Sequence, residues 1–168
     1  MPSRTDLGKL LHECLQDIAS LLEQGRVAAV EQQRALVAND AEALARTCTA
    51  QEEIVRRIAD CDQAAADAAA QLSELAGLDP ETVDADSVAE AAGPQHAGAI
   101  TSEIERIGAL ARDLQNEHEI NRHLLENGLE IIACCLRTLA ADSGPNSYSQ
   151  DAEILEIHPF VLSLDRKA

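Results

Sequence analysis

Apolar residues recur in alternating steps of four and three along three long stretches of this chain. Such heptad spacing gives a helix one apolar face and is typical of coiled coils and helical bundles. The three predicted seams are Leu7, Leu11, Leu15, Ile18, Leu22, Gly25, Ala29, Gln32 and Leu36; Leu44, Cys48, Gln51, Val55, Ile58, Asp62, Ala65, Ala69, Leu72 and Ala76; and Ile104, Ile107, Ala111, Leu114, His118, Asn121, Leu125, Gly128, Ile132, Cys135 and Leu139. The pattern predicts an all-α protein.

The core before residue 142 must be aliphatic, because the two aromatic residues, Tyr148 and Phe160, both follow it. Leu, Ile, Val and Ala suit closely packed helices better than sandwiches or barrels. The predicted helices run over about 5–37, 40–76 and 100–141, with a connecting loop at 77–98 that contains one or two short helical turns. The residues that signal their ends are Asn39 with Glu42 and Ser102 with Glu105, as capping boxes, and Gly77 with Pro80, as a C-terminal stop.

The short turn after residue 37 predicts that the first two helices form an antiparallel hairpin, with the third helix packed against it. Residues 1–142 are therefore predicted to form an elongated helical bundle. Residues 143–168 are predicted to be a linker and a docked or mobile tail.

The tail contains the most apolar stretch of the chain, residues 154–164. Its large apolar residues alternate on either side of Pro159, as in an extended segment, and are predicted to dock: Leu155, Ile157, Phe160, Leu162 and Leu164. Burying each contributes roughly 1.5–3 kcal/mol, against a backbone ordering cost of about 1–2 kcal/mol per residue. Net docking should be weak. The tail is either a placeholder over a partner groove or a permanent part of the core.

The net charge of -17, from 30 acidic and 13 basic residues, argues against nucleic-acid binding, which needs a basic face. The acidic surface either keeps the protein dissolved or steers basic partners toward it. The longest apolar run, 131–136, is too short to span a membrane. Five cysteines without a C-x-x-C motif or a signal peptide indicate a reducing cytosol and free thiols.

No catalytic or metal constellation is apparent. The chain has no Glu-x-x-His motif, and His118 is expected to be a partly buried, hydrogen-bonded residue. Cys14, Cys48 and Cys135 lie on or beside the seams and are expected to be small core residues. We therefore expect no enzyme activity, cofactor or metal.

Several seam positions are small or polar: Gly25, Gln32, Gln51, Asp62, His118, Asn121 and Gly128. A polar seam residue either fixes helix register or leaves room for a partner. The grouping of His118, Asn121 and Gly128 on the third helix favours a partner groove there. The predicted partner-binding residues are Asn121, Leu125, Gly128, Leu129 and Ile132.

The third helix carries a family resemblance. Its stretch 121–132, Asn-Arg-His-Leu-Leu-Glu-Asn-Gly-Leu-Glu-Ile-Ile, resembles the N-x-x-L-L-x-N stretch of FlgN-type flagellar type III export chaperones. The hairpin is similar as well, at Glu31, Ala35, Leu36, Asp40, Leu44 and residues 53–58. The resemblance covers about residues 7–150. It departs at Gln51, where the family commonly has a lysine, and no match is apparent after residue 153.

The resemblance implies a cytoplasmic chaperone that holds the amphipathic C-terminal segment of hook–filament junction proteins. It would prevent their premature assembly and deliver them to the flagellar export apparatus, by helix-in-groove recognition. A related filament-cap chaperone would look similar. The alternative is a self-associating structural coiled coil without a secretion client; the chaperone should be a monomer or a weak homo-oligomer when empty.

Overall fold

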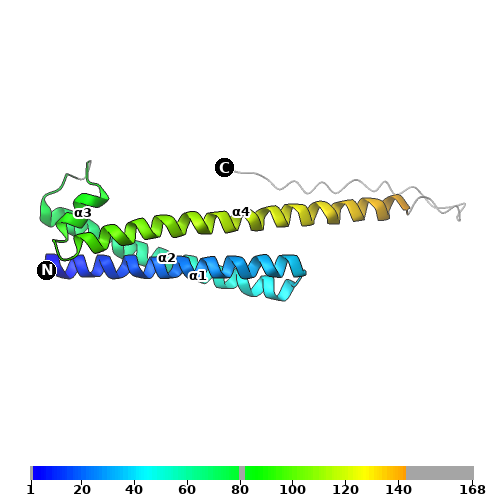
Figure 1. Cartoon of the computed structure of the whole chain (residues 1–168), viewed down its shortest axis with the longest axis horizontal. Helices are drawn as coiled ribbons and strands as arrows, with labels where there is room; N and C mark the ends of the chain where they lie inside the picture. Colours follow the sequence, from blue (N-terminus) through cyan, green and yellow to red (C-terminus); the bar gives the residue numbers. More distant parts are fainter. Residues whose placement is uncertain (1, 80–81, 143–168) are drawn as a thin grey trace, which may run out of the picture. The chain divides into compact units, whose positions relative to one another are not determined.

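The structure, a computed structural model, describes residues 2–79 and 82–142, with side chains as far as residue 140. It is all-α, as predicted, with helices α1 (Arg4–Ala38), α2 (Ala41–Ala76), α3 (Ala85–Ala91) and α4 (Ala97–Asp142) (Figure 1). The chain divides into two units, Met1–Glu130 and Ile131–Ala168, and α4 is one continuous helix that belongs to both.

Helices α1 and α2 form the predicted hairpin, but its turn differs from the prediction by one residue. Asn39 adopts a left-handed conformation (φ 53°) and ends α1. Asp40 is the N-cap of α2, because its Oδ1 accepts a hydrogen bond from the backbone N–H of Ala43 at 2.9 Å. The predicted capping box of Asn39 with Glu42 is therefore wrong. Asn tolerates left-handed backbone, so Asn39 makes the reversal and leaves capping to its neighbour.

The connection contains the short helix that was expected, α3, whose N-cap Asp84 accepts a hydrogen bond from the Ser87 N–H at 2.9 Å. Gly77 ends α2 in a left-handed conformation (φ 67°), as predicted. The long helix predicted over about 100–141 begins three residues earlier, at Ala97, so Ser102 lies inside α4 and is not its N-cap. The Gly93 carbonyl accepts the Ala97 N–H at 3.0 Å and so begins the helical turn earlier.

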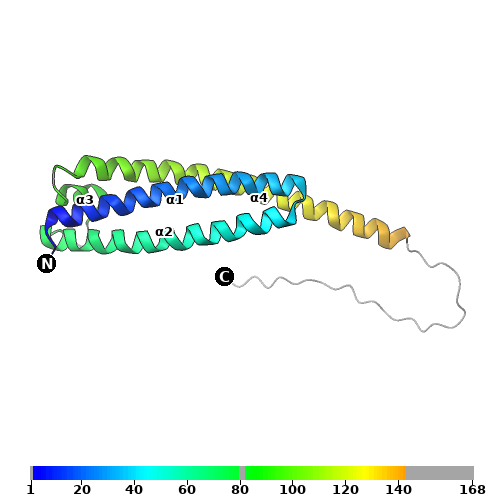
Figure 2. The ribbon, with the colours of Figure 1, turned by 90° about the horizontal axis from the view of Figure 1, so that it is seen from below.

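In the unit Met1–Glu130, α1 and α2 lie side by side with the first part of α4, and α3 lies against one end of the hairpin (Figure 2). Pairs between α1 and α4 follow the same order along both helices, so the two helices run parallel: Glu23–Arg106 at 2.7 Å, Arg26–Asp113 at 3.6 Å, and Ala29–Asn121 at 2.8 Å.

Aliphatic side chains fill the end of the bundle beside α3. Leu7, Leu11, Leu72 and Ile100 are buried there, together with small residues. The alanines come from α2, which contributes Ala65 and Ala68, and from the segment of α3, which contributes Ala89, Ala91 and Ala92. These small side chains let the helices approach closely at this end of the bundle.

The predicted seams of α2 and α4 are correct at every seventh residue, in α4 only as far as residue 128, and at several positions in between the inward-facing residue is the one before the predicted one. In α2, Val55 and Asp62 are exposed, and the positions facing the bundle are Ile54 and Cys61. In α4 the exposed residues are Ala111, His118 and Leu125, and the inner ones are Leu110, Glu117 and Leu124. Counting from a seam residue, the residues three and four positions later lie on either side of the same helix face. In these two helices, the residue three positions later is the one that faces the neighbouring helices.

Two further expectations are corrected by this shift. His118 is exposed rather than partly buried. Of the three cysteines expected in the core, Cys14 is buried and Cys48 half-buried, but Cys135 is exposed on α4.

Candidate functional site

Three of the predicted polar seam residues meet in one layer that joins α1, α2 and α4. Asn121 is 3% exposed, and its Nδ2 donates to the Ala29 carbonyl at 2.8 Å and to Gln32 Oε1 at 3.0 Å. Gln51 Nε2 donates to the same Gln32 oxygen at 3.3 Å, and Gln32 Nε2 donates to Cys48 Sγ at 3.6 Å. We therefore assign Asn121, which the sequence placed in the partner groove, to the interior, where such a layer can fix helix register.

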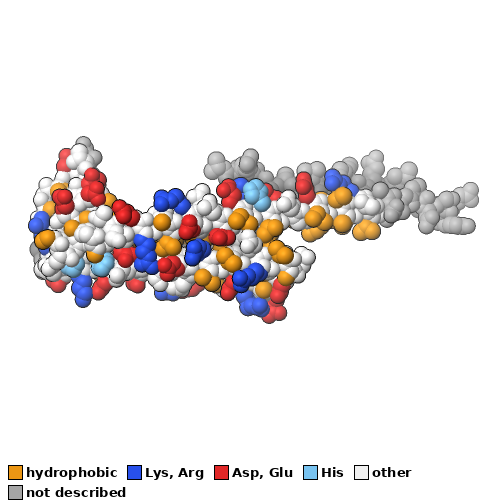
Figure 3. Space-filling model, in the orientation of Figure 1, with side chains coloured by type: hydrophobic (Ala, Val, Ile, Leu, Met, Phe, Trp, Pro, Cys, Tyr) orange, Lys and Arg blue, Asp and Glu red, His pale blue; other side chains and the backbone are white. Residues whose placement is uncertain are grey.

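Beyond this layer, α4 exposes a line of large apolar side chains, which we call the α4 stripe. It comprises Leu125, Leu129, Ile132, Leu136 and Leu139. These residues are spaced four, three, four and three apart, so they form one line on a continuous helix. Their side chains are between 44% and 65% exposed. Hydrophobic side chains gather along this end of α4 in Figure 3. Three of the five predicted partner-binding residues therefore lie on the stripe.

Gly128, the remaining predicted site residue, lies between the buried Asn121 and the stripe. Apart from its two chain neighbours and the nearby backbone of α4, no described residue has an atom within 4 Å of where a Cβ at this position would stand. The backbone of α4 is therefore open at Gly128, and another helix can approach it closely there.

A shallow groove of about 420 Å³ lies between α1 and α4. Its apolar walls are Val37, Ile120 and Leu124, with Gln33, Arg34 and Ala38 beside them. This groove was not predicted, because residues 37–40 were interpreted as a break between helices. The available signal in the sequence was that Val37 and Ile120 are apolar residues off the predicted seams.

The charged residues beside the stripe pair with one another and do not indicate a charged ligand. Arg122 pairs with Glu119 at 3.3 Å and with Glu126 at 3.9 Å, and His123 Nδ1 lies 3.4 Å from Glu126. These pairs are within one helix and exposed, so each contributes little to stability. The surface that remains for a partner is apolar.

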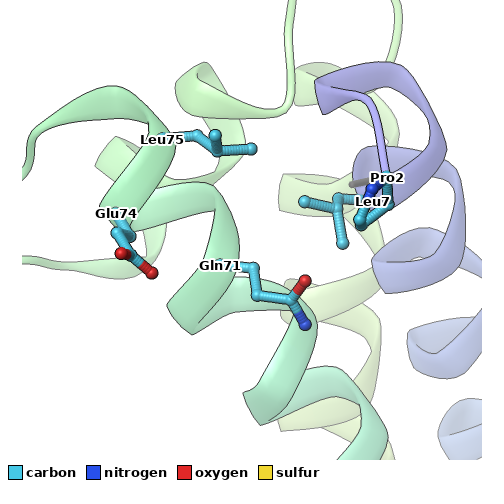
Figure 4. Close-up of a pocket in the computed structure, with 5 residues that line it drawn as sticks. All are labelled: Pro2, Leu7, Gln71, Glu74 and Leu75. Carbon is cyan, nitrogen blue, oxygen red and sulfur yellow. The ribbon is translucent and has the colours of Figure 1, made fainter.

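A hollow near the start of α1 and the end of α2 does not combine the groups that a catalytic site needs. It has a volume of about 370 Å³ and is lined by Pro2, Leu7, Gln71, Glu74 and Leu75 (Figure 4). Among the described residues that line it, Glu74 is the one titratable side chain, without a second acid, a base or a nucleophile beside it. Over residues 2–79 and 82–142, no cluster of three or more His, Cys, Asp or Glu side chains could hold a metal ion.

Within residues 2–79 and 82–142, no helix is both long and apolar enough to cross a bilayer. The predicted tail-docking residues, Leu155, Ile157, Phe160, Leu162 and Leu164, lie outside the described residues.

A comparison with protein families matches residues 1–156 to the family described as FlgN protein. No curated protein sequence and no solved structure matches the chain.

Proposed function

The chain belongs to the FlgN family of flagellar export chaperones, and we propose that its clients are flagellar hook–filament junction proteins. It would bind their amphipathic C-terminal segments in the cytoplasm, prevent premature assembly and deliver them to the export apparatus. This client class agrees with the resemblance of residues 121–132 to the family's N-x-x-L-L-x-N stretch.

The α4 stripe is the observation that carries the proposal. Five large apolar side chains stand in heptad spacing along an exposed helix face, which is the complement that an amphipathic client helix needs. Leu125, Leu129 and Ile132, together with the open backbone at Gly128, would form the centre of the contact. The groove lined by Val37, Ile120 and Leu124 offers a second apolar contact beside α4.

The expected affinity is moderate. Fully burying a Leu or Ile contributes roughly 1.5–3 kcal/mol, and these side chains are already partly covered. Ordering a disordered client segment costs about 2–5 kcal/mol of the gross interaction energy. Such a balance suits a chaperone, because the client must be released again at the export apparatus.

Co-purification tests the proposal directly. The chain is co-expressed with tagged C-terminal segments of a junction protein, a filament-cap protein and an unrelated amphipathic helix. Capture by the junction segment alone supports the proposal. Capture by the cap segment alone assigns the chain to a different client. Capture by neither, together with a stable homodimer in light scattering, favours the self-associating coiled coil.

A further inference from the structure

We infer that residues 154–164 of the tail fold back along α4 and cover the α4 stripe when no client is bound. The segment and the client would then compete for the same side chains. The competition rests on the proposed function, whereas the folding back of the tail does not.

The stripe needs a cover. Residues 131–140 of α4 are all exposed, and Ile132, Leu136 and Leu139 continue the line that begins at Leu125. Arg137 is the single charged residue among these ten, in a chain with a net charge of -17. Monomeric proteins in water rarely leave so long an apolar face open.

The tail has the length to reach it. The eleven residues 143–153 can span about 36 Å when extended, at ~3.3 Å per residue. Leu125 lies about 26 Å back along α4 from Asp142, at 1.5 Å per residue. Residues 154–164 can therefore begin at any level of the stripe. If extended, those eleven residues outreach its length of about 21 Å, from Leu125 to Leu139.

The residue pattern of the tail fits the stripe. Phe160, Leu162 and Leu164 share one side of an extended segment, and Val161 falls on the other. Asp151 and Glu153 precede this segment and Glu156 lies within it. Their negative charges are opposite in sign to that of Arg137. The family match ends at residue 156, so residues 157–164 of the segment lie outside it.

A second copy of the chain is a poorer occupant than the tail. The stripe spans about two heptads, fewer than the three or four that a coiled-coil dimer usually needs. Two chains of charge -17 also repel each other. A tethered segment is instead present at an effective concentration in the millimolar range.

The accessibility of two neighbouring thiols on α4 shows whether the tail covers the stripe. Cys135 lies three residues after Ile132 and four before Leu139, so it borders the stripe. Cys134 is two residues from both Ile132 and Leu136, which places it on the opposite side. Both thiols are exposed and free. A tail on the stripe should shield Cys135 and leave Cys134 accessible.

The experiment measures the alkylation rates of both thiols by tandem mass spectrometry, without client, in three full-length proteins. They are the natural chain, Phe160→Ser/Leu162→Ser, and the matched control Val161→Ser. We expect the double variant to alkylate Cys135 at least threefold faster, with Cys134 unchanged, and Val161→Ser to behave like the natural chain. Equal Cys135 rates in all three proteins would overturn the inference. So would an equal acceleration of both thiols, which would indicate a general loosening of the helix.

Client binding then tests the competition. If the tail covers the stripe nine-tenths of the time, removing the cover raises client affinity about tenfold. Phe160→Ser/Leu162→Ser should show this gain and Val161→Ser should not. Unchanged affinity despite a shielded Cys135 would show that tail and client do not share the stripe. The alkylation assay contains no client, so its result is independent of the proposed client.

Discussion

Asn121 on α4 donates a hydrogen bond from its buried side-chain amide to Oε1 of Gln32 on α1, at 3.0 Å. The same oxygen accepts a hydrogen bond from Gln51 on α2. One side-chain oxygen therefore links all three long helices. The Oδ1 atom of Asn121 has no hydrogen-bond partner among the described residues, so the layer is only partly satisfied. Such a layer costs stability but penalises every helix register that would separate its members.

Replacing Asn121 tests this layer. Asn121→Ala removes the donor to both α1 acceptors, so the free energy of unfolding should fall by about 1–3 kcal/mol. Asn127, an exposed asparagine on the same helix, is the matched control. Asn127→Ala should change the free energy of unfolding by no more than about 0.5 kcal/mol. Urea unfolding measures both. Equal losses in the two variants would show that the Asn121 layer adds nothing specific.

Two helical glycines should respond in opposite ways to Ala. At Gly128 a new Cβ would meet no described residue outside its own stretch of α4 within 4 Å, so the gain in helix propensity should stabilise the protein by roughly 0.5–1 kcal/mol. At Gly8 the new Cβ would stand 3.0 Å from the carbonyl oxygen and from the Cβ of Ala92. That overlap costs about 1–3 kcal/mol.

Thermal unfolding should therefore rank Gly128→Ala above the natural chain and Gly8→Ala level with it or below. The reverse order would mean that α1 does not approach Ala92 so closely. Gly128→Ala should also bind client more weakly despite its higher stability, if the client helix approaches α4 at that point.

Some features of this fold could be predicted from the sequence and others could not, for physical reasons. Heptad spacing fixes which seven-residue register faces inward, so Gln51, Ile58, Leu114 and Asn121 were placed correctly. It does not say whether the residue three or four ahead completes the seam, because both lie on the same face. The exposed Asp62 was an available signal, since a charge on the seam is costly to bury.

The helix ends show the same division. Gly77 was correctly predicted to end α2, because only a few residue types tolerate its left-handed conformation. Ser3 and Asp6 form a capping box at the start of α1 that the sequence analysis did not use. The hydrogen bonds of Asn121 could not be predicted, because they depend on which residues of α1 lie opposite.

Cys14 should make stability fall at alkaline pH. Burial raises the pKa of its thiol, with nearby carboxylates and Cys61 adding to the shift. A raised pKa in the folded state means that the neutral thiol is favoured there. Its contribution is complete below the ordinary thiol pKa and is lost as pH rises through the higher folded value. The free energy of unfolding should therefore decline less steeply above the ordinary thiol pKa of 9.0 in Cys14→Ala than in the natural chain. Parallel pH profiles for the two proteins would contradict this.

We also predict that the protein binds no stoichiometric metal. Its histidines and cysteines are not gathered into a three-ligand cluster in the part of the chain that the structure describes. Elemental analysis of protein purified without an affinity tag measures the metal content directly. A full equivalent of zinc or iron would overturn our assignment of Cys14 and Cys48 as packing residues.

Two adjacent isoleucines on α4 test the central claim, that the α4 stripe binds the client. Ile132 is 57% exposed and lies on the stripe, whereas Ile131 is 64% exposed and points about 100° away around the helix. Ile132→Ser and Ile131→Ser thus remove equal side chains with similar exposure. Their far-UV circular dichroism should match that of the natural chain, because neither side chain is buried. Leu125→Ser extends the test to the start of the stripe.

Isothermal titration calorimetry with a junction-protein C-terminal segment is the deciding measurement. We expect Ile132→Ser to weaken binding by about tenfold, the loss of one apolar contact of roughly 1.4 kcal/mol, and Ile131→Ser to weaken it less than about twofold. Equal effects of the two substitutions, or unfolding by Ile132→Ser, would contradict the assignment of the stripe as the client-binding surface.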